Sequence, residues 1–229
     1  MRDETQKSSD ALAAWLSKVA PVGCAVAVSS TDAPGISDFA EEEIHAASFA
    51  PGRRFEFRAG RLAARAALAQ LGAPRCALPS RTAGDPVWPA GFVGSISHDR
   101  NVVVAVAAPS TTLSGVGLDL EPQVPLEAEL IGLICRVDEP GDDASLSALG
   151  VDPAKLRFVA KEACFKAIFP AQRVMFDFLD LVIAFDAASG TFGARPANPR
   201  NAASLRSLLE LRGYFGRAGG YICALACLR

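Results

Sequence analysis

Basic residues other than arginine are scarce in this chain of 229 residues. It contains five lysines and two histidines, His45 and His98, against 18 arginines, and its formal net charge is −2. Two histidines leave little material for a histidine-rich metal site. A net charge close to zero disfavours two whole-protein descriptions, a strongly basic nucleic-acid binder and an acidic, solvating chain.

A long uninterrupted apolar segment is also missing. Residues 11–29 come nearest to one, but Lys18 and Pro21 interrupt them, and the ten residues before them carry three acidic and two basic side chains. A membrane span needs about 20 apolar residues, and a signal peptide needs a positively charged start. The six cysteines form no C-x-x-C pair and mostly lie in apolar runs, as reduced buried thiols do. We therefore expect a soluble, cytoplasmic protein without a membrane span.

Two segments have helical periodicity between helix breakers. The first covers about residues 52–71, between Pro51 and Gly72, and the second covers 153–169, opened by Asp152-Pro153 and closed by Pro170. Further helices are predicted at 126–135 and, from a weaker pattern, at 202–211. Loops are predicted at 138–150 and 189–200, which are rich in glycine, proline and aspartate.

Short runs of β-forming residues surround each of the two main helices. The predicted strands cover residues 22–29, 92–97, 102–107, 116–120, 181–185 and 222–228. The strand at 102–107 is apolar on both faces and should therefore be central in its sheet. Strands, a helix and strands, followed by the same order again, predict an α+β fold of two halves, residues 1–112 and 113–229.

Arginines recur along one face of the first predicted helix. Their spacing of three to four residues places them in a narrow stripe. The stripe consists of Arg54, Arg58, Arg61 and Arg65. Four guanidinium groups on one face repel each other unless anions or carboxylates neutralise them. The pattern therefore fits either a solvated face paired with acidic residues or a docking surface for a polyphosphate, which Arg53 at the helix entrance would extend.

Two further segments carry candidate site residues. A turn containing proline and tryptophan at residues 84–91 leads into a strand that ends at Ser97-His98; a histidine there can face a site or simply bond to its neighbours. In residues 115–122, Asp119 and Glu121 alternate with leucines that should point into the core, so the two carboxylates share one face. They repel unless a cation such as Mg²⁺ lies between them, although an exposed acidic strand end paired with arginine has the same pattern.

The second predicted helix combines an aromatic stripe with a charged pair. Phe158, Phe165 and Phe169 share one face, and Glu162 and Lys166 lie on its flank. Such a pair usually lies on the surface and stabilises the helix only slightly. Partial desolvation beside phenylalanines can, however, also shift the pKa of a catalytic acid or base.

Taken together, these segments resemble one known family. The sequences R-R-x-E-F-x-x-G-R-x-A-A-R-x-A-L, W-P-x-G-x-x-G-S-I-S-H, G-L-D-L-E-P and F-V-A-K-E-A-C-F-K-A follow one another between about residues 51 and 170. In this order they resemble the 4′-phosphopantetheinyl transferases, in particular the larger, monomeric, two-halved type of siderophore, polyketide and non-ribosomal peptide synthesis. The arginine-rich segment is similar to the bacterial branch typified by the enterobactin component.

The resemblance implies a fold and a reaction. Each half would be a small, mainly antiparallel sheet packed on a long helix, and the two halves would be related by a pseudo-twofold axis. The enzyme would move the 4′-phosphopantetheine group of coenzyme A onto a serine of an apo acyl or peptidyl carrier protein and release 3′,5′-ADP. The reaction would require Mg²⁺, with Mn²⁺ as a possible substitute.

The resemblance also implies roles for individual residues. Asp119, Glu121 and Glu162 would bind the metal ion, Glu162 would also take the serine proton, and Lys166 would stabilise or protonate the leaving phosphate. The residues expected to contact coenzyme A are Arg53, Arg61, Arg81, Ser97, His98, Lys161 and Lys166.

Two other functions remain open from the residues alone. A Mg²⁺-dependent nuclease can also combine an acidic pair with a later glutamate and lysine, although it would want a basic groove. A degenerate relative could bind coenzyme A without transferring anything.

Overall fold

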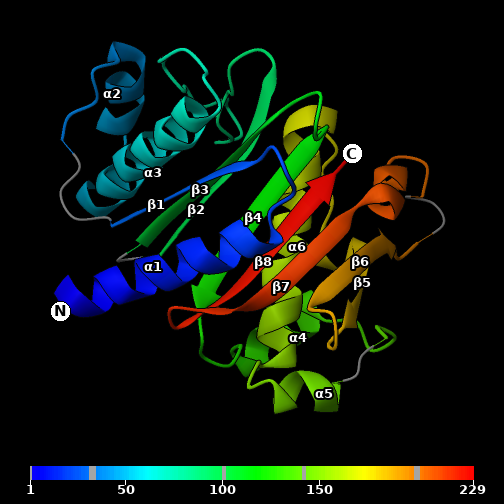
Figure 1. Cartoon of the computed structure of the whole chain (residues 1–229). Coiled ribbons are helices and arrows are strands. Elements are labelled where there is room, and N and C mark those ends of the chain that lie inside the picture. The colour runs from blue at the N-terminus through cyan, green and yellow to red at the C-terminus, as the bar shows by residue number, and fades with distance from the viewer. Residues whose placement is uncertain (1, 31–34, 100–101, 141–142, 199–201) are drawn as a thin grey trace. The chain divides into compact units, whose positions relative to one another are not determined.

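The computed structural model describes residues 2–30, 35–99, 102–140, 143–198 and 202–229. The chain separates into two compact units, Met1–Leu113 and Ser114–Arg229, so the division predicted after residue 112 lies one residue from this point. Each unit combines helices with one small antiparallel sheet (Figure 1), which confirms the predicted α+β class.

The first unit is a three-stranded sheet covered by a long helix. Its elements are α1 (Arg2–Val19), β1 (Ala25–Ser30), α2 (Ala40–Ala47), α3 (Pro51–Gln70), β2 (Phe92–Asp99) and β3 (Val102–Pro109). The strand order is β1-β3-β2, which confirms the central position of β3. Small side chains of α3 pack closely on this sheet, since Ala63 and Ala67 are buried in one cluster with Val103 and Ala105.

The second unit is a five-stranded sheet around a second long helix. Its helices are α4 (Ala128–Ile134), α5 (Asp143–Ala148), α6 (Pro153–Gln172), and the 3₁₀ segments η1 (Phe178–Asp180) and η3 (Arg206–Glu210). Its strands, in the order β4-β8-β7-β6-β5, are β4 (Gly115–Pro122), β8 (Tyr221–Leu228), β7 (Arg212–Ala218), β6 (Thr191–Pro196) and β5 (Leu181–Asp186).

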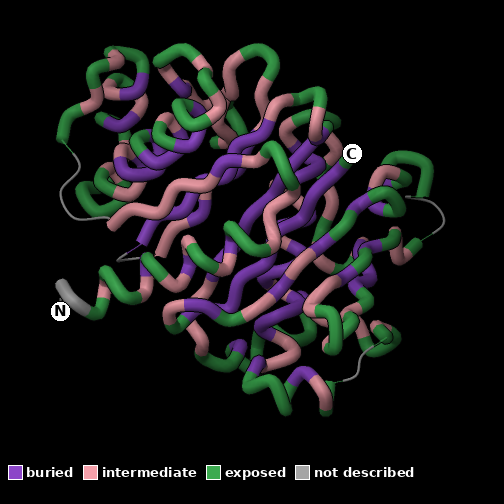
Figure 2. Tube along the Cα trace, in the orientation of Figure 1, coloured by how far each residue is buried: buried purple, intermediate pink, exposed green. Residues whose placement is uncertain are grey.

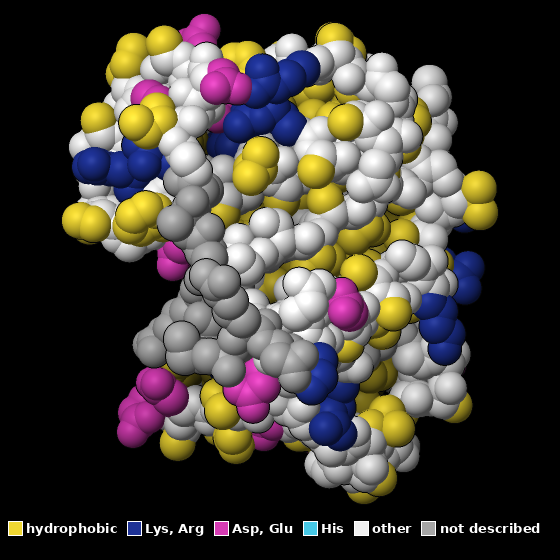
Figure 3. Space-filling model, turned by 60° about the vertical axis from the view of Figure 1, so that its left-hand side comes forward, with side chains coloured by type: hydrophobic (Ala, Val, Ile, Leu, Met, Phe, Trp, Pro, Cys, Tyr) yellow, Lys and Arg dark blue, Asp and Glu magenta, His cyan; other side chains and the backbone are white. Residues whose placement is uncertain are grey.

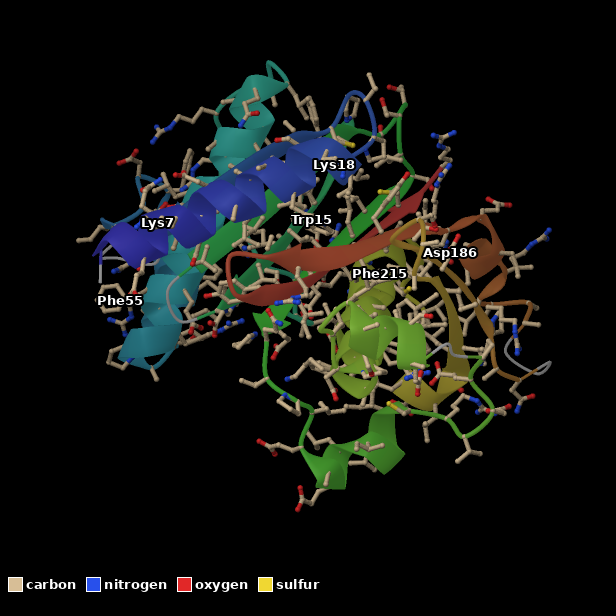
Figure 4. All side chains as sticks on the ribbon, turned by 60° about the horizontal axis from the view of Figure 1, so that its bottom comes forward. Lys7, Trp15, Lys18, Phe55, Asp186 and Phe215 are labelled. Atoms are coloured by element: carbon tan, nitrogen blue, oxygen red, sulfur yellow. The ribbon has the colours of Figure 1, made fainter. Side chains whose placement is uncertain are left out.

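Helix α6 is the centre of this second unit. Asp152 caps it by accepting a hydrogen bond from the backbone N–H of Lys155 at 2.7 Å, and Pro153 occupies its first turn. Its apolar side chains pack against β4, β5 and β8, and β8 is buried along its whole length (Figure 2). Phe215 of β7 belongs to the same core, whereas Asp186 is exposed at the end of β5 (Figure 4).

Several boundaries differ from the prediction. Pro170 does not end α6, which continues to Gln172 and ends at Arg173 in the left-handed conformation, where the guanidinium lies 4.3 Å from the centre of the Phe169 ring. The predicted helix at 202–211 is only the short η3, and the predicted loops at 138–150 and 189–200 contain α5 and β6.

Helices α1 and α2 and strand β7 were not predicted. The part of α1 that lies in the apolar run was not recognised as a helix, whereas the strand predicted at residues 22–29 corresponds to β1. None of the helices among the described residues is long and apolar enough to cross a membrane.

Candidate active site

Close packing of β4 on α6 positions the acidic residues of the second unit. A Cβ atom on Gly115 would lie 2.2 Å from the carbonyl oxygen of Ala167, and one on Gly117 would lie 1.9 Å from that of Ala163. Only glycine fits at these two positions. Because alternate residues of a strand share a face, Asp119 and Glu121 continue the same face of β4.

Each of these two carboxylates is paired with a lysine of α6. Lys166 donates a hydrogen bond from Nζ to Oδ1 of Asp119 at 2.7 Å, and Lys155 donates from Nζ to Oε2 of Glu121 at 3.3 Å. Asp119 and Lys155 are buried, which strengthens these pairs relative to exposed ones. Leu118 and Leu120, on the other face of β4, are also buried, as predicted.

Glu162 of α6 lies close enough to the carboxylates of Asp119 and Glu121 for their negative charges to affect its pKa. Burial raises the pKa of Glu162, and the negative charges of Asp119 and Glu121 raise it further, while Lys166 opposes them. The structure thus brings together four residues predicted from the sequence, on adjoining faces of one strand and one helix. In the described part of the chain, however, no three His, Cys, Asp or Glu side chains are arranged as a ready metal site.

A small apolar pocket lies beside Glu162. Its volume is about 210 Å³. Besides Glu162 it is lined by Lys161, Phe165, Met175, Phe176, Asp177, Phe178 and Leu181. The rings of Phe165 and Phe176 contact each other edge to face at 5.2 Å, so one wall is aromatic.

Lys161 differs from its predicted role as a contact for coenzyme A. Its ammonium group is inaccessible to solvent; it donates to the carbonyl oxygen of Ile134 at 2.7 Å and forms an ion pair of 2.9 Å with Glu139. Lys161 therefore forms a buried ion pair with Glu139 in this structure, although its side chain also lines the apolar pocket. Conversely, Lys155 was missed, although its spacing of seven residues from Glu162 places both on one helix face.

In the first unit, several predicted contacts for coenzyme A line one groove. Its volume is about 390 Å³, and Arg53, Arg61, Arg81 and His98 all contribute to it. Its other lining residues are His45, Phe49, Glu56, Phe57, Gly60, Ser80, Thr82, Ala83, Gly84, Pro86 and Ile96. Ser97 is buried and is not among the described residues that line this groove, because it alternates with His98 along β2.

Arg61 is the most firmly held basic side chain of the groove. Its Nε donates to the carbonyl oxygen of Leu78 and its Nη2 to Oγ of Ser80, both at 2.6 Å, and its guanidinium lies 4.4 Å from the centre of the Phe57 ring. Burial lowers the pKa of Arg61 to about 10, so it remains charged at neutral pH. A fixed, partly desolvated guanidinium is well suited to an anion.

The other basic groups of the groove have acidic neighbours. Arg53 donates from Nη1 to Nε2 of His98 at 2.6 Å and to Glu56 at 3.2 Å, and Nδ1 of His98 lies 3.7 Å from the same carboxylate. Arg81 forms an ion pair of 2.7 Å with Asp85.

The remaining arginines of the predicted stripe do not form a phosphate surface. Arg58 makes two hydrogen bonds to Glu43, at 2.9 and 2.5 Å, and Arg65 pairs with the buried Glu42 at 2.5 Å. Arg54 donates to backbone carbonyl groups, including those of Ala46 and Phe49. For Arg58 and Arg65 the interpretation as a face paired with acidic residues was right, whereas Arg54 has backbone partners instead. On the surface shown in Figure 3, basic and acidic side chains lie in small separate groups rather than in one broad basic area.

Comparison with known proteins gives a consistent result. Residues 40–108 match the model of the 4′-phosphopantetheinyl transferase N-terminal domain. The chain is 34% identical to 4′-phosphopantetheinyl transferase Svp of Streptomyces mobaraensis over 80% of this chain and 76% of that protein. It is 32% identical to PptT of Mycobacterium tuberculosis over 84% of this chain and 86% of PptT. It is 35% identical to Npt of Nocardia iowensis over 66% of this chain and 68% of Npt. Both of these relatives are also named 4′-phosphopantetheinyl transferases.

Proposed function

The chain belongs to the 4′-phosphopantetheinyl transferases, and from this premise we propose which of its residues carry the reaction. It is a transferase that moves the phosphopantetheine group of coenzyme A to carrier proteins. One observation carries our assignment of the chemistry: Asp119 and Glu121 of β4 lie close enough to the buried Glu162 of α6 to affect its pKa, and Lys166 of α6 is bonded to Asp119.

The groove of the first unit binds the nucleotide part of coenzyme A. Arg61 is held there by Leu78 and Ser80, so its charge is preorganised for a phosphate group. Arg53 and His98 add donors beside it, and Arg81 contributes once a phosphate competes with Asp85. Ser97 acts indirectly, by fixing the end of the strand that carries His98.

Asp119, Glu121 and Glu162 would hold a Mg²⁺ ion, for which Mn²⁺ could substitute. The donor set supports this because all three side chains offer carboxylate oxygens, which suit hard cations. Burial is the main cause of the raised pKa of Glu162, and a cation would relieve the repulsion by Asp119 and Glu121 that adds to it. Lys166 and Lys155 neutralise two of these carboxylates in their present positions. When bound, the ion would neutralise charge on the pyrophosphate of coenzyme A.

Glu162 takes the proton of the attacking serine hydroxyl, directly or through a water molecule. The serine oxygen forms a bond to the phosphorus that carries the pantetheine arm, and the bond from this phosphorus to the bridging oxygen breaks. Lys166 stabilises the charge on the departing phosphate, so that 3′,5′-ADP leaves. The apolar pocket beside Glu162 suits the uncharged pantetheine arm better than a phosphate.

We also propose the biological setting. The acceptors are apo acyl or peptidyl carrier proteins of siderophore, polyketide or non-ribosomal peptide synthesis, and the enzyme works as a cytoplasmic monomer. The siderophore assignment is supported by the similarity of the arginine-rich segment between residues 53 and 68 to that branch of the family.

A transfer assay tests the proposal. The protein is incubated with coenzyme A, Mg²⁺ and each of several apo carrier proteins, and the carrier should gain the mass of one phosphopantetheine. The Glu162→Gln variant should lose at least about 100-fold in kcat, because a general base contributes roughly 10² to 10⁴-fold. It should still bind coenzyme A in calorimetry.

The control is Glu210→Gln, which changes an exposed carboxylate at the end of η3. It should transfer at the wild-type rate. If the folded protein modifies no carrier, the enzymatic proposal is wrong, and if Glu162→Gln turns over normally, the assignment of Glu162 is wrong.

A further inference from the structure

A fully buried carboxylate, Glu139, lies outside the proposed catalytic set. Its side chain has no exposed surface, and its Oε1 lies 2.9 Å from Nζ of Lys161, while Nε of Arg157 lies 3.7 Å from Oε2. It also accepts two backbone hydrogen bonds, from the N–H of Ile183 at 3.1 Å and from that of Arg136 at 3.0 Å. A buried carboxylate with this many hydrogen-bond and ion-pair partners is fixed in position, and it links the segments that carry those partners.

One partner of Glu139, Lys161, lines the apolar pocket, and another, Ile183, lies in the chain next to a second part of its lining. Lys161 and Glu162 form the α6 wall, and Leu181, two residues before Ile183, belongs to the opposite wall with residues 175–178. The loop that carries Glu139 is also tied to this second wall by Arg136, which donates from Nη1 to the carbonyl oxygen of Leu179 at 3.0 Å. Glu139 thus joins the two walls without lining the pocket itself.

We propose that Glu139 is a positioning residue, which holds Glu162 at the correct distance from the segment 175–181 through Lys161 and Ile183. This inference rests on the proposed catalytic role of Glu162. Glu162 directly follows Lys161, so a shift of the Lys161 backbone moves the proposed base with it. A displacement of about 1 Å at a reacting group can cost roughly 100-fold in rate.

The opposing explanation is that the Glu139–Lys161 pair only stabilises the fold. Removing one partner of a buried ion pair leaves an uncompensated charge, whereas replacing both partners with neutral groups often restores stability. The two explanations therefore differ in the double variant. A positioning role predicts that stability returns while the rate stays low, because the glutamine that replaces Glu139 offers one acceptor oxygen where the carboxylate supplied two.

The experiment compares Glu139→Gln, Lys161→Met and the double variant with the wild-type enzyme. We expect Glu139→Gln and the double variant to lower kcat about 10- to 100-fold, with the dissociation constant for coenzyme A unchanged within twofold. Amide hydrogen exchange of residues 175–183 should speed up in both, while exchange in residues 51–70 stays as in the wild type. The exchange measurement needs no activity, so it reports on Glu139 even if the wild-type protein transfers nothing.

Glu42→Gln is the matched control. Glu42 is also fully buried, pairs with Arg65 and accepts the backbone N–H of Leu78 at 2.8 Å, but it belongs to the first unit. It should lower the thermal stability and leave kcat at saturating coenzyme A unchanged. The proposal is overturned if the double variant regains wild-type kcat, or if exchange of residues 175–183 stays at the wild-type rate in Glu139→Gln. It is likewise overturned if Glu42→Gln lowers kcat as much as Glu139→Gln does.

Discussion

The close approach of β4 and α6 at Gly117 makes a quantitative prediction for Gly117→Ala. The added Cβ would lie 1.9 Å from the carbonyl oxygen of Ala163 and 2.5 Å from the backbone nitrogen of Ala167, both of them helix backbone atoms that cannot rotate away. Ordinary contact begins near 3.4 Å, so the strand and the helix must move apart by most of the difference between this distance and 1.9 Å.

That separation acts directly on the proposed site. Asp119 lies two residues further along β4, whereas Glu162 and Lys166 belong to α6. The substitution should therefore lengthen the hydrogen bond between Lys166 and Asp119 and move Glu162 away from the strand. Overpacking of this kind costs about 1–3 kcal/mol in the free energy of unfolding. A misplacement of about 1 Å or more should lower kcat by roughly 100-fold.

Transfer kinetics and thermal unfolding of the same preparation test the prediction. The KM for coenzyme A should change little, because the groove proposed to bind the nucleotide belongs to the other unit. Gly193→Ala on β6 is the matched control, since its Cβ would meet no described atom within 4 Å. It should keep the wild-type kcat and melt within a few degrees of the wild type. Wild-type kcat and Tm in Gly117→Ala would refute the reasoning.

Three further predictions concern binding and stability. Arg61→Ala should raise the KM for coenzyme A at least 10-fold with little change in kcat, because it removes contacts to a part of the substrate that does not react; an unchanged KM would place the nucleotide elsewhere. The Arg58 guanidinium holds the pKa of Glu43 below its usual value, so this pair stabilises the fold above the ordinary glutamate pKa, near 4.3, and its contribution is lost as the pH falls through the lower folded value. Glu43→Gln should therefore lower Tm at pH 7 by an amount equivalent to at most about 1 kcal/mol and leave it unchanged near pH 2, and an equal loss at both pH values would contradict the ion pair. Asp152→Ala should destabilise the protein by about 1 kcal/mol in denaturant titration, since it removes the cap of α6, and an unchanged midpoint would show that the cap contributes nothing.

The sequence predicted best those elements whose signals are local. Both long helices begin at a proline in the first turn, and their periodicity places them within a few residues of α3 and α6. Strand β3 was identified as central because six consecutive residues, 102–107, are apolar, and all six are buried. These signals depend on neighbouring residues alone and need no knowledge of tertiary contacts.

Elements that depend on pairing were missed. Strand β7 contains Gly213 and Gly216, and β6 lies in a segment rich in glycine and proline, so neither has a strong intrinsic preference for strand. Each gains its strand geometry by pairing with a neighbour, β7 with β8 and β6 with β5. Helix α1 was missed for a different reason: only Leu12, Leu16 and Ser9 among its described residues are buried, which is too sparse a pattern to read from the sequence.

Helical geometry explains why Lys155 and Lys166 both reach the carboxylates of β4, whereas Lys161 does not. Lys166 follows Glu162 by four residues and Lys155 precedes it by seven, and both spacings keep the side chains on one face of a helix. Lys161 is the immediate neighbour of Glu162, so its side chain leaves the helix in a different direction. The structure pairs Lys155 with Glu121. The spacing alone therefore favoured Lys155 as a lysine on the same helix face as Glu162. The resemblance to a family motif directed attention to Lys161 instead.

The arginines of α3 show what periodicity leaves undecided. Arg58, Arg61 and Arg65 share one helix face, yet Arg58 and Arg65 are bound to Glu43 and Glu42 of α2, which lie 15 and 23 residues earlier in the chain. Arg61 has a backbone carbonyl group and a hydroxyl as partners instead, and neither cancels its charge. Periodicity identifies the basic side chains that share a face, but the tertiary partners decide which charge remains available to a ligand. By this criterion Arg61 has the strongest claim among the three to bind a phosphate.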